Sequence, residues 1–184
     1  MGCGQFLNGI ALGCGGNLGG IREVHIARFD DVAELVVADG VVTAVGLRDG
    51  VRFKNYAMRR EGGQFTVTSV EDADGRLAYY ESDIELYFSR LDTAKRLEIE
   101  SLAQDYLMVI VTDANGQMWL FGREGGVELV TVDGTTGKAH TDSNGYTIVL
   151  RDECSGLPIE VAHLAPWDFS AGDFNNDFAT GIFD

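Results

Sequence analysis

The sequence predicts a mainly β fold, with two antiparallel sheets packed as a sandwich or small barrel, one flanking α-helix and extended arms at both ends. The first observation behind this prediction is that short stretches alternate between apolar and polar residues with a period of two. The second is that Gly-based turn sequences separate these stretches, as short strands in a sandwich or barrel require. Four such turns are Asp39-Gly40, Asp49-Gly50, Gly62-Gly63 and Asp74-Gly75.

The first expected strand covers residues 21–28, where Val24 and Ile26 alternate with polar or small neighbours. Similar stretches predict the remaining strands at 41–45, 51–58, 64–70, 77–89, 107–112, 117–121, 126–132, 145–150 and 159–164.

Within 77–89, the side chains of Ile84, Leu86 and Phe88 should share one face, and Glu85 and Tyr87 the other. The sequence Asp113-Ala114-Asn115-Gly116 predicts a hairpin between two further strands, because Asn-Gly adopts positive φ at little cost.

One segment, 94–104, has the composition of a helix, and Asp92 or Thr93 can cap its N-terminus. Since this helix stands alone among strands, we expect it to cover one side or end of the β core. Its apolar face would be made of Ile99, Leu102, Ala103 and Tyr106.

The chain divides into a Gly-rich N-terminal arm (1–20), a β domain (21–164) and an aromatic, acidic C-terminal tail (165–184). Eight glycines in the arm alternate with apolar residues, which predicts a segment that orders against a neighbouring subunit; the alternative is a Gly-rich strand or turn of the core. The expected inter-subunit residues of the arm are Phe6, Leu7, Ile10 and Leu12.

Aromatic side chains in the tail should dock onto the chain's own body or onto a neighbour; the residues concerned are Trp167, Phe169 and Phe174. The same tail suggests a calcium loop as a weaker alternative, because oxygen-bearing side chains recur at spacings close to those of an EF-hand. The four candidate ligands are Asp173, Asn175, Asp177 and Asp184. Phe178 stands where such a loop wants Gly.

The formal net charge of −15 argues against a simple nucleic-acid binder, whose affinity for phosphate comes from Lys and Arg. The acidity gives either solubility or a surface that nucleic acid passes without sticking. Against this background, the segment 48–63 gathers basic residues, including Lys54, Arg59 and Arg60. We expect it to contact an acidic patch on an adjacent subunit, or to be a solvated hairpin.

Neither a catalytic site nor a cofactor is expected. The histidines His25, His140 and His163 lie in separate segments with no nucleophile–base motif. Three cysteines without a CxxC pair argue against a zinc site and against a disulfide framework, which is typical of a protein made in a reducing cytoplasm. No apolar run is long enough to predict a membrane span.

The stretch 79–161 combines several of these elements in a characteristic order. A long strand (Ile84-Glu85-Leu86-Tyr87-Phe88) precedes a helix with Ala94-Lys95-Arg96 near its start and Leu102-Ala103 near its end. The strand Met108-Val109-Ile110-Val111, the turn Asp113-Ala114-Asn115-Gly116 and the strand Met118-Trp119-Leu120-Phe121-Gly122 follow. Thr136-Gly137-Lys138-Ala139 then leads into Asp142-Ser143-Asn144-Gly145-Tyr146-Thr147-Ile148-Val149-Leu150. In this order the chain resembles the tail-tube proteins of bacteriophages and prophages, those of Bacteroidetes hosts in particular.

The resemblance implies a structural virion protein, assembled in the cytoplasm of the host bacterium and not an enzyme. Its partners would be its own copies, in rings (commonly hexamers) that stack into a tube, and other tail proteins. Inner strands of each ring would form a barrel around the lumen, where DNA passes as cargo that is not bound. Alternatives of related kind are a head–tail connector, a tail-terminator or a baseplate hub protein. An alternative of another class is a calcium-binding β-module.

Overall fold

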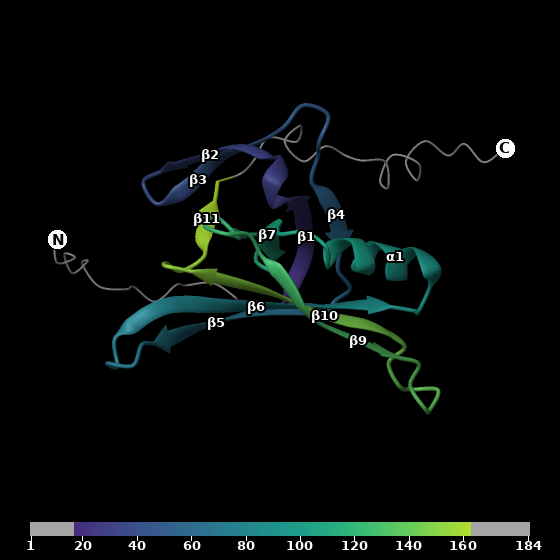
Figure 1. Cartoon of the computed structure of the whole chain (residues 1–184). Helices are drawn as coiled ribbons and strands as arrows, with labels where there is room; N and C mark the ends of the chain where they lie inside the picture. Colours follow the sequence, from purple (N-terminus) through teal and green to yellow (C-terminus); the bar gives the residue numbers. More distant parts are fainter. Residues whose placement is uncertain (1–16, 163–184) are drawn as a thin grey trace.

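The computed structural model describes residues 17–162, which form two β-sheets and one α-helix (Figure 1). Of the described residues, 55% are in strands and 9% are helical, so the fold is mainly β. The predicted sandwich is confirmed, whereas the alternative of a closed small barrel is not formed. Within residues 17–162, the outermost strands of both sheets therefore have one edge without a partner strand.

Seven strands form the larger sheet in the order β2-β3-β11-β8-β7-β1-β4, and four form the smaller in the order β5-β6-β10-β9. The elements of the seven-stranded sheet are β1 (Ile21–Arg28), β2 (Val32–Ala38), β3 (Val41–Leu47), β4 (Lys54–Ala57), β7 (Leu107–Asp113), β8 (Met118–Phe121) and β11 (Ile159–Val161). Those of the four-stranded sheet are β5 (Gly63–Glu71), β6 (Leu77–Ser89), β9 (Glu128–Thr135) and β10 (Gly145–Cys154). A short 3-10 turn, η1 (Phe29–Asp31), precedes β2, and helix α1 (Thr93–Leu102) follows β6.

Strand β7 is the centre of the packing because it is buried on both faces. Val109 and Val111 belong to the core shared with the four-stranded sheet, whereas Met108 and Ile110 belong to a second core with β3. Figure 1 shows the corresponding layers, with the β2–β3 hairpin on one side of β7 and the four-stranded sheet on the other. A continuous apolar run is what a strand covered on both faces requires.

Helix α1 begins as the sequence predicts, with the Asp92 side chain accepting a hydrogen bond from the Lys95 amide at 2.8 Å. Ile99 and Leu102 are buried against the sandwich. The predicted apolar face is otherwise wrong, because the helix ends at Leu102, so that Ala103 and Tyr106 leave the helical spacing and are exposed.

The sequence pattern missed β2, which is the one unexpected strand of residues 17–162. The reason is visible in its pairing with β3, where the register shifts between Val32 and Glu34 and again between Val36 and Val37. The first shift adds Ala33 to β2, whereas the second adds Thr43 to β3. Because four apolar residues (Leu35-Val36-Val37-Ala38) also follow one another in β2, the sequence of this segment shows no run with a period of two.

The predicted hairpin at 113–116 is confirmed. Asp113 donates its amide to the Gln117 carbonyl at 2.9 Å, and Gly116 has a φ of 89°. The Asp113 carboxylate accepts from the Asn115 and Gln117 amides at 2.8 and 2.9 Å, which fixes the turn between β7 and β8.

Candidate functional site: the outer face and edges of the four-stranded sheet

The four-stranded sheet turns one face to the core and the other to solvent. On β6, Ser82, Ile84 and Leu86 are buried and their odd-numbered neighbours point outward, as the sequence predicts for this strand. The outward positions of the sheet carry the carboxylates Glu81, Asp83, Glu85, Asp133 and Glu153. This outward side, called the outer face below, is therefore strongly acidic.

Arg151 of β10 is the one basic residue on the strands of the outer face, and carboxylates surround it. Its guanidinium donates to both oxygens of Asp83, from Nε at 2.8 Å and from a terminal nitrogen at 2.9 Å. A second terminal nitrogen lies 3.3 Å from the Glu81 carboxylate. The hydrogen bonds that Arg151 donates to Asp83 raise the pKa of Arg151 above its usual value. Because its donors are engaged in this fork geometry, Arg151 offers little to a passing phosphate.

The remaining outward side chains of the sheet are mostly small and polar. Besides Tyr79, Tyr87, Val70 and Val149 they include Gln64, Thr66, Thr68, Thr131 and Thr147. Apart from these two tyrosines and two valines the face is polar, and it is therefore suited to remain in contact with water.

Both edges of this sheet are open in the part of the chain that the structure describes, since β5 pairs only with β6 and β9 only with β10. Neither strand contains the Lys, Arg or Pro that commonly protect a free edge. On β9, Val130 and Val132 are 43% and 44% exposed. These features are typical of edges that another strand covers.

The two edge strands run in opposite directions. Each neighbouring pair in β5-β6-β10-β9 is antiparallel, so four strands leave β5 and β9 antiparallel to one another. A second copy related by rotation about an axis along the strands would therefore place its β5 antiparallel to β9 of the first. The sheet can continue from copy to copy without a change in its pairing pattern.

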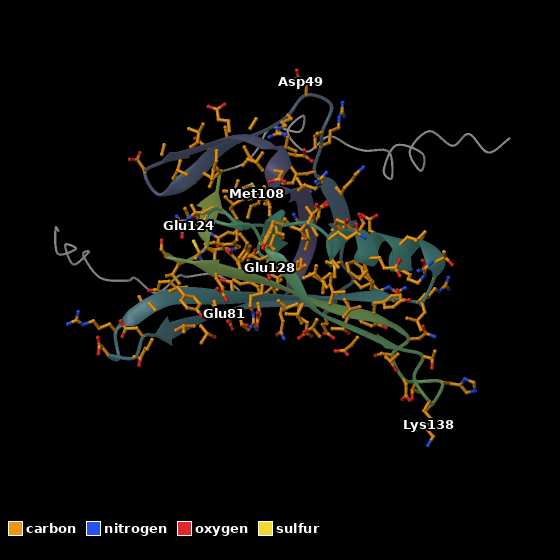
Figure 2. All side chains as sticks on the ribbon, viewed as in Figure 1. Asp49, Glu81, Met108, Glu124, Glu128 and Lys138 are labelled. Carbon is orange, nitrogen blue, oxygen red and sulfur yellow. The ribbon has the colours of Figure 1, made fainter. Side chains whose placement is uncertain are left out.

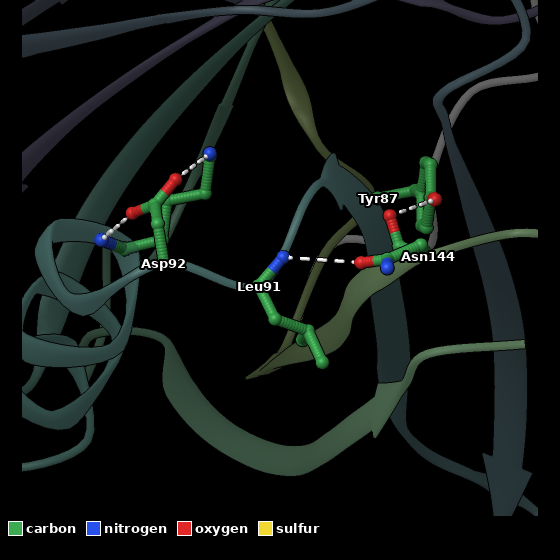
Figure 3. Close-up of polar contacts among 5 residues, drawn as sticks. Tyr87, Leu91, Asp92 and Asn144 are labelled. Carbon is green, nitrogen blue, oxygen red and sulfur yellow. Dashed lines mark hydrogen bonds and ion pairs between the residues drawn. The ribbon is translucent and has the colours of Figure 1, made fainter.

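Asn144 holds one end of this sheet in place (Figure 3). Its side-chain oxygen accepts a hydrogen bond from the Leu91 amide at 3.2 Å, and its carbonyl accepts from the Tyr87 hydroxyl at 2.8 Å. The Arg90 amide donates to the same carbonyl at 2.7 Å. These contacts join the loop before β10 to the connection between β6 and α1, in which Asp92 caps the helix (Figure 3).

A different polar cluster lies at the opposite end of the sheet, around Glu124. The Glu124 carboxylate accepts from the Ser155 hydroxyl at 2.6 Å and from the Ser155 amide at 2.9 Å. These hydrogen bonds lower the pKa of Glu124 to about 2. The Arg123 guanidinium lies 3.1 Å from Glu124 and donates from Nε to the buried Cys154 sulfur at 3.3 Å. The cluster fastens the β8–β9 loop to the end of β10.

Asp152 lies beside this cluster and is buried, with burial raising the pKa of its carboxyl. Its Oδ1 has no hydrogen-bond partner among residues 17–162. His25 of β1 is also buried; burial lowers its pKa, and the nearby Glu23 carboxylate acts in the opposite direction. His140 lies in the loop between β9 and β10, so it does not join His25 in one site. His163 lies outside the described residues.

The basic residues that the sequence singled out are separated. Lys54 opens the edge strand β4, opposite Ile26, whereas Arg59 and Arg60 lie in the turn that leads into β5. The other expected contact residues and the calcium candidates lie outside the described residues: Phe6, Leu7, Ile10, Leu12, Trp167, Phe169, Phe174, Asp173, Asn175, Asp177 and Asp184. Within 17–162 no group of three or more His, Cys, Asp or Glu side chains is arranged to hold a metal ion.

The sequence pattern did not identify the outer face as a site. The signal was present, because the alternation of Glu85 and Tyr87 with buried neighbours continues back to Asp83 and Glu81. Arg151 could not be found in this way, since its partner Asp83 is 68 residues away in the chain.

Comparisons of the chain with protein-family models, with curated proteins and with solved structures give no match. No helix within residues 17–162 is long and apolar enough to cross a membrane. The outer face and the two open edges are therefore the features from which a function can be inferred.

Proposed function

We propose that the chain is a structural subunit of a bacteriophage tail tube, in which copies close into rings through their β9 and β5 edges. The outer face of the four-stranded sheet lines the channel through which double-stranded DNA passes. One observation carries the proposal: an acidic, polar face belongs to a sheet whose two edges are both open and antiparallel to one another.

Ring closure follows from the directions of the edge strands. A contact between β9 of one copy and β5 of the next uses two different surfaces, so an open row of copies keeps a free β5 edge at one end and a free β9 edge at the other until the ring closes. Closure then removes every open edge of the four-stranded sheets, including the exposed Val130 and Val132.

The charge of the outer face supports its position around DNA. Duplex DNA binds proteins mainly through Lys and Arg, which displace counterions from the phosphates. A channel lined by carboxylates, with Arg151 already paired to Asp83 and Glu81, repels phosphates and lets DNA slide.

The resemblance to tail-tube proteins concerns the same part of the molecule. The stretch 79–161 includes most of β6 and all of α1, β9 and β10, and so most of the proposed channel lining. A head–tail connector or tail-terminator protein would also form a ring, but it would be present in few copies and would not build long stacks.

The experiment is to measure the mass of the purified chain by light scattering over a wide concentration range and to image it by negative-stain microscopy. We expect rings with a central hole, alone or stacked. A monomer at every concentration would contradict the proposal, and single rings that never stack would favour the terminator.

A variant of the β9 edge tests the proposed contact. In Val130→Lys/Val132→Lys, two exposed valines become charged, which a folded monomer tolerates but a neighbouring strand does not. We expect folded monomers without rings. Val36→Lys/Val37→Lys is the matched control, because these valines are 36% and 44% exposed on β2, an edge of the other sheet. Rings that persist in the β9 variant, or that disappear in the control, would contradict the contact.

A further inference from the structure

The two ends of the four-stranded sheet differ in charge. One end contains the β5–β6 turn and the last residues of β10, which lie close together because Glu153 pairs with Glu81 near the start of β6. Its exposed charged residues are Glu71, Asp72, Asp74, Arg76 and Glu153, besides Glu124, which is paired with Arg123. Four carboxylates against one guanidinium make this the acidic end.

The other end contains the turn before β5, the connection from β6 to α1 and the loop between β9 and β10. Backbone hydrogen bonds join these segments, from Tyr87 to Gly62 and from Arg90 to Asn144, both at 2.7 Å. The exposed cations there are Arg59, Arg60, Arg90 and Lys138. This is the basic end, and Glu61 and Asp142 only partly offset its charge.

The cations of the basic end are available to a partner. Among residues 17–162, none of the four forms an ion pair, whereas Lys95 and Arg96 on the adjacent helix are paired to Asp92 and Glu100. Asp142 is also engaged, since its carboxylate accepts from the Lys138 and Ala139 amides. In a chain of net charge −15, four unpaired cations at one end are a marked asymmetry.

The two ends lie far apart along the strands. Strand β6 joins them with 13 residues, which corresponds to about 40 Å. Figure 2 shows Glu81 and Lys138 toward opposite ends of the four-stranded sheet. Contact between a basic and an acidic end therefore requires two copies of the chain.

We propose that the basic end of one copy binds the acidic end of a second copy, so that copies stack head to tail along the strands of the four-stranded sheet. This inference rests on the proposed ring, in which the strands of the four-stranded sheets run from one rim to the other. The acidic ends then lie at one rim and the basic ends at the opposite rim. Each subunit of a ring makes the same weak surface contacts with the next ring, so that many weak contacts together hold two rings together. Opposite charges also set the stacking direction, because like ends repel.

Charge reversal tests the contact. In Arg59→Glu/Arg60→Glu, both ends become acidic, and in Glu71→Lys/Asp74→Lys, both become basic. We expect each variant to form rings that no longer stack at 50 mM salt. Wild-type stacks should shorten between 50 mM and 1 M salt, since the screening length falls to about 3 Å. Arg52→Glu/Lys54→Glu is the control, with the same charge change at exposed residues of the other sheet and its loop.

Mixing the two reversed variants gives the decisive result. Rings with two acidic ends and rings with two basic ends should stack alternately, which microscopy and light scattering detect. Rings that fail to mix into stacks, or that stack equally well in each variant alone, would overturn the inference but leave the ring intact. If the wild-type chain forms no rings, the ring proposal is wrong. The mixture then still tests whether a basic end binds an acidic end. If the two variants do not associate when mixed, that contact does not form.

Discussion

Gly145 lies where β10 begins opposite Ser89, and the backbone of β6 leaves no room for a side chain. A Cβ atom at this position would lie 2.1 Å from the Phe88 carbonyl oxygen. We expect Gly145→Ala to lower the free energy of unfolding by about 1–3 kcal/mol, because the two strands must separate locally. Urea unfolding measures this, with Gly125→Ala as the control, since nothing lies within 4 Å of a Cβ there. Equal stability of the two variants would contradict the close approach.

Glu124 gives a prediction for pH. Its pKa falls from 4.5 to about 2 on folding, mainly through the Ser155 hydrogen bonds, so the carboxylate stabilises the fold above pH 4.5. This contribution is lost as the pH falls through about 2. We expect Glu124→Gln to melt below the wild type at pH 7, with a modest difference because the side chain is 42% exposed.

The comparison of melting temperatures between pH 7 and pH 2 isolates this cluster, because carboxylates outside it titrate alike in both proteins. Within the cluster, the pKa of Asp152 is raised by burial and also by the Glu124 charge. The difference between variant and wild type should shrink from pH 4.5 downward. If the difference in melting temperature stays constant to pH 2, the cluster does not stabilise the ionised form of Glu124, and the prediction is wrong.

Helix α1 is held to the sandwich by few side chains. Leu102 is 8% exposed and packs in the main core, whereas Leu97 on the same helix is 53% exposed. We expect Leu102→Ala to cost about 2–4 kcal/mol and Leu97→Ala less than about 0.5 kcal/mol, measured by urea unfolding. Similar costs for both would mean that the helix packs through another face.

The sequence predicted most strands because each has a simple environment. The alternation on β6 corresponds to a strand with one buried face. The continuous apolar run of β7 corresponds to a strand with two buried faces. The strand β2 could not be predicted, since the extra residue Ala33 and the apolar run 35–38 leave no regular alternation, and its place beside β3 depends on pairing. Tyr106 was misplaced because α1 ends at Leu102, so that Tyr106 lies beyond the helix.

The candidate site could be predicted only in part. The local pattern indicates which side chains share a face, but not that β6 and β10 bring Asp83 beside Arg151. Nor does it show that β5 and β9 are the two edges of one sheet, which depends on strand order. The sequence gives the net charge of the chain. Only the fold shows how the charged side chains are distributed over the outer face and the two ends of the four-stranded sheet.

For the whole molecule, the acidic lining should keep DNA from binding. We expect assembled wild-type protein to leave double-stranded DNA in the supernatant on sedimentation at 50 mM salt. Glu81→Gln/Asp83→Asn/Glu85→Gln removes three carboxylates and frees Arg151, so DNA retention should increase. The control Glu34→Gln/Asp39→Asn/Asp49→Asn removes three exposed charges on or beside the β2–β3 hairpin. Equal retention by both variants would contradict a special role for the outer face.

Amide hydrogen exchange tests the central claim most directly, because it reports which strand edges become covered on assembly. Exchange in assembled wild-type protein is compared with exchange in the monomeric Val130→Lys/Val132→Lys variant. We predict that assembly slows exchange in β5 (63–71), the edge that the variant leaves unchanged, and in β9 (128–135), and leaves β2 and β4 unaffected. Slower exchange confined to β2 or β4, or no change at β5 and β9, would contradict ring closure through the four-stranded sheet.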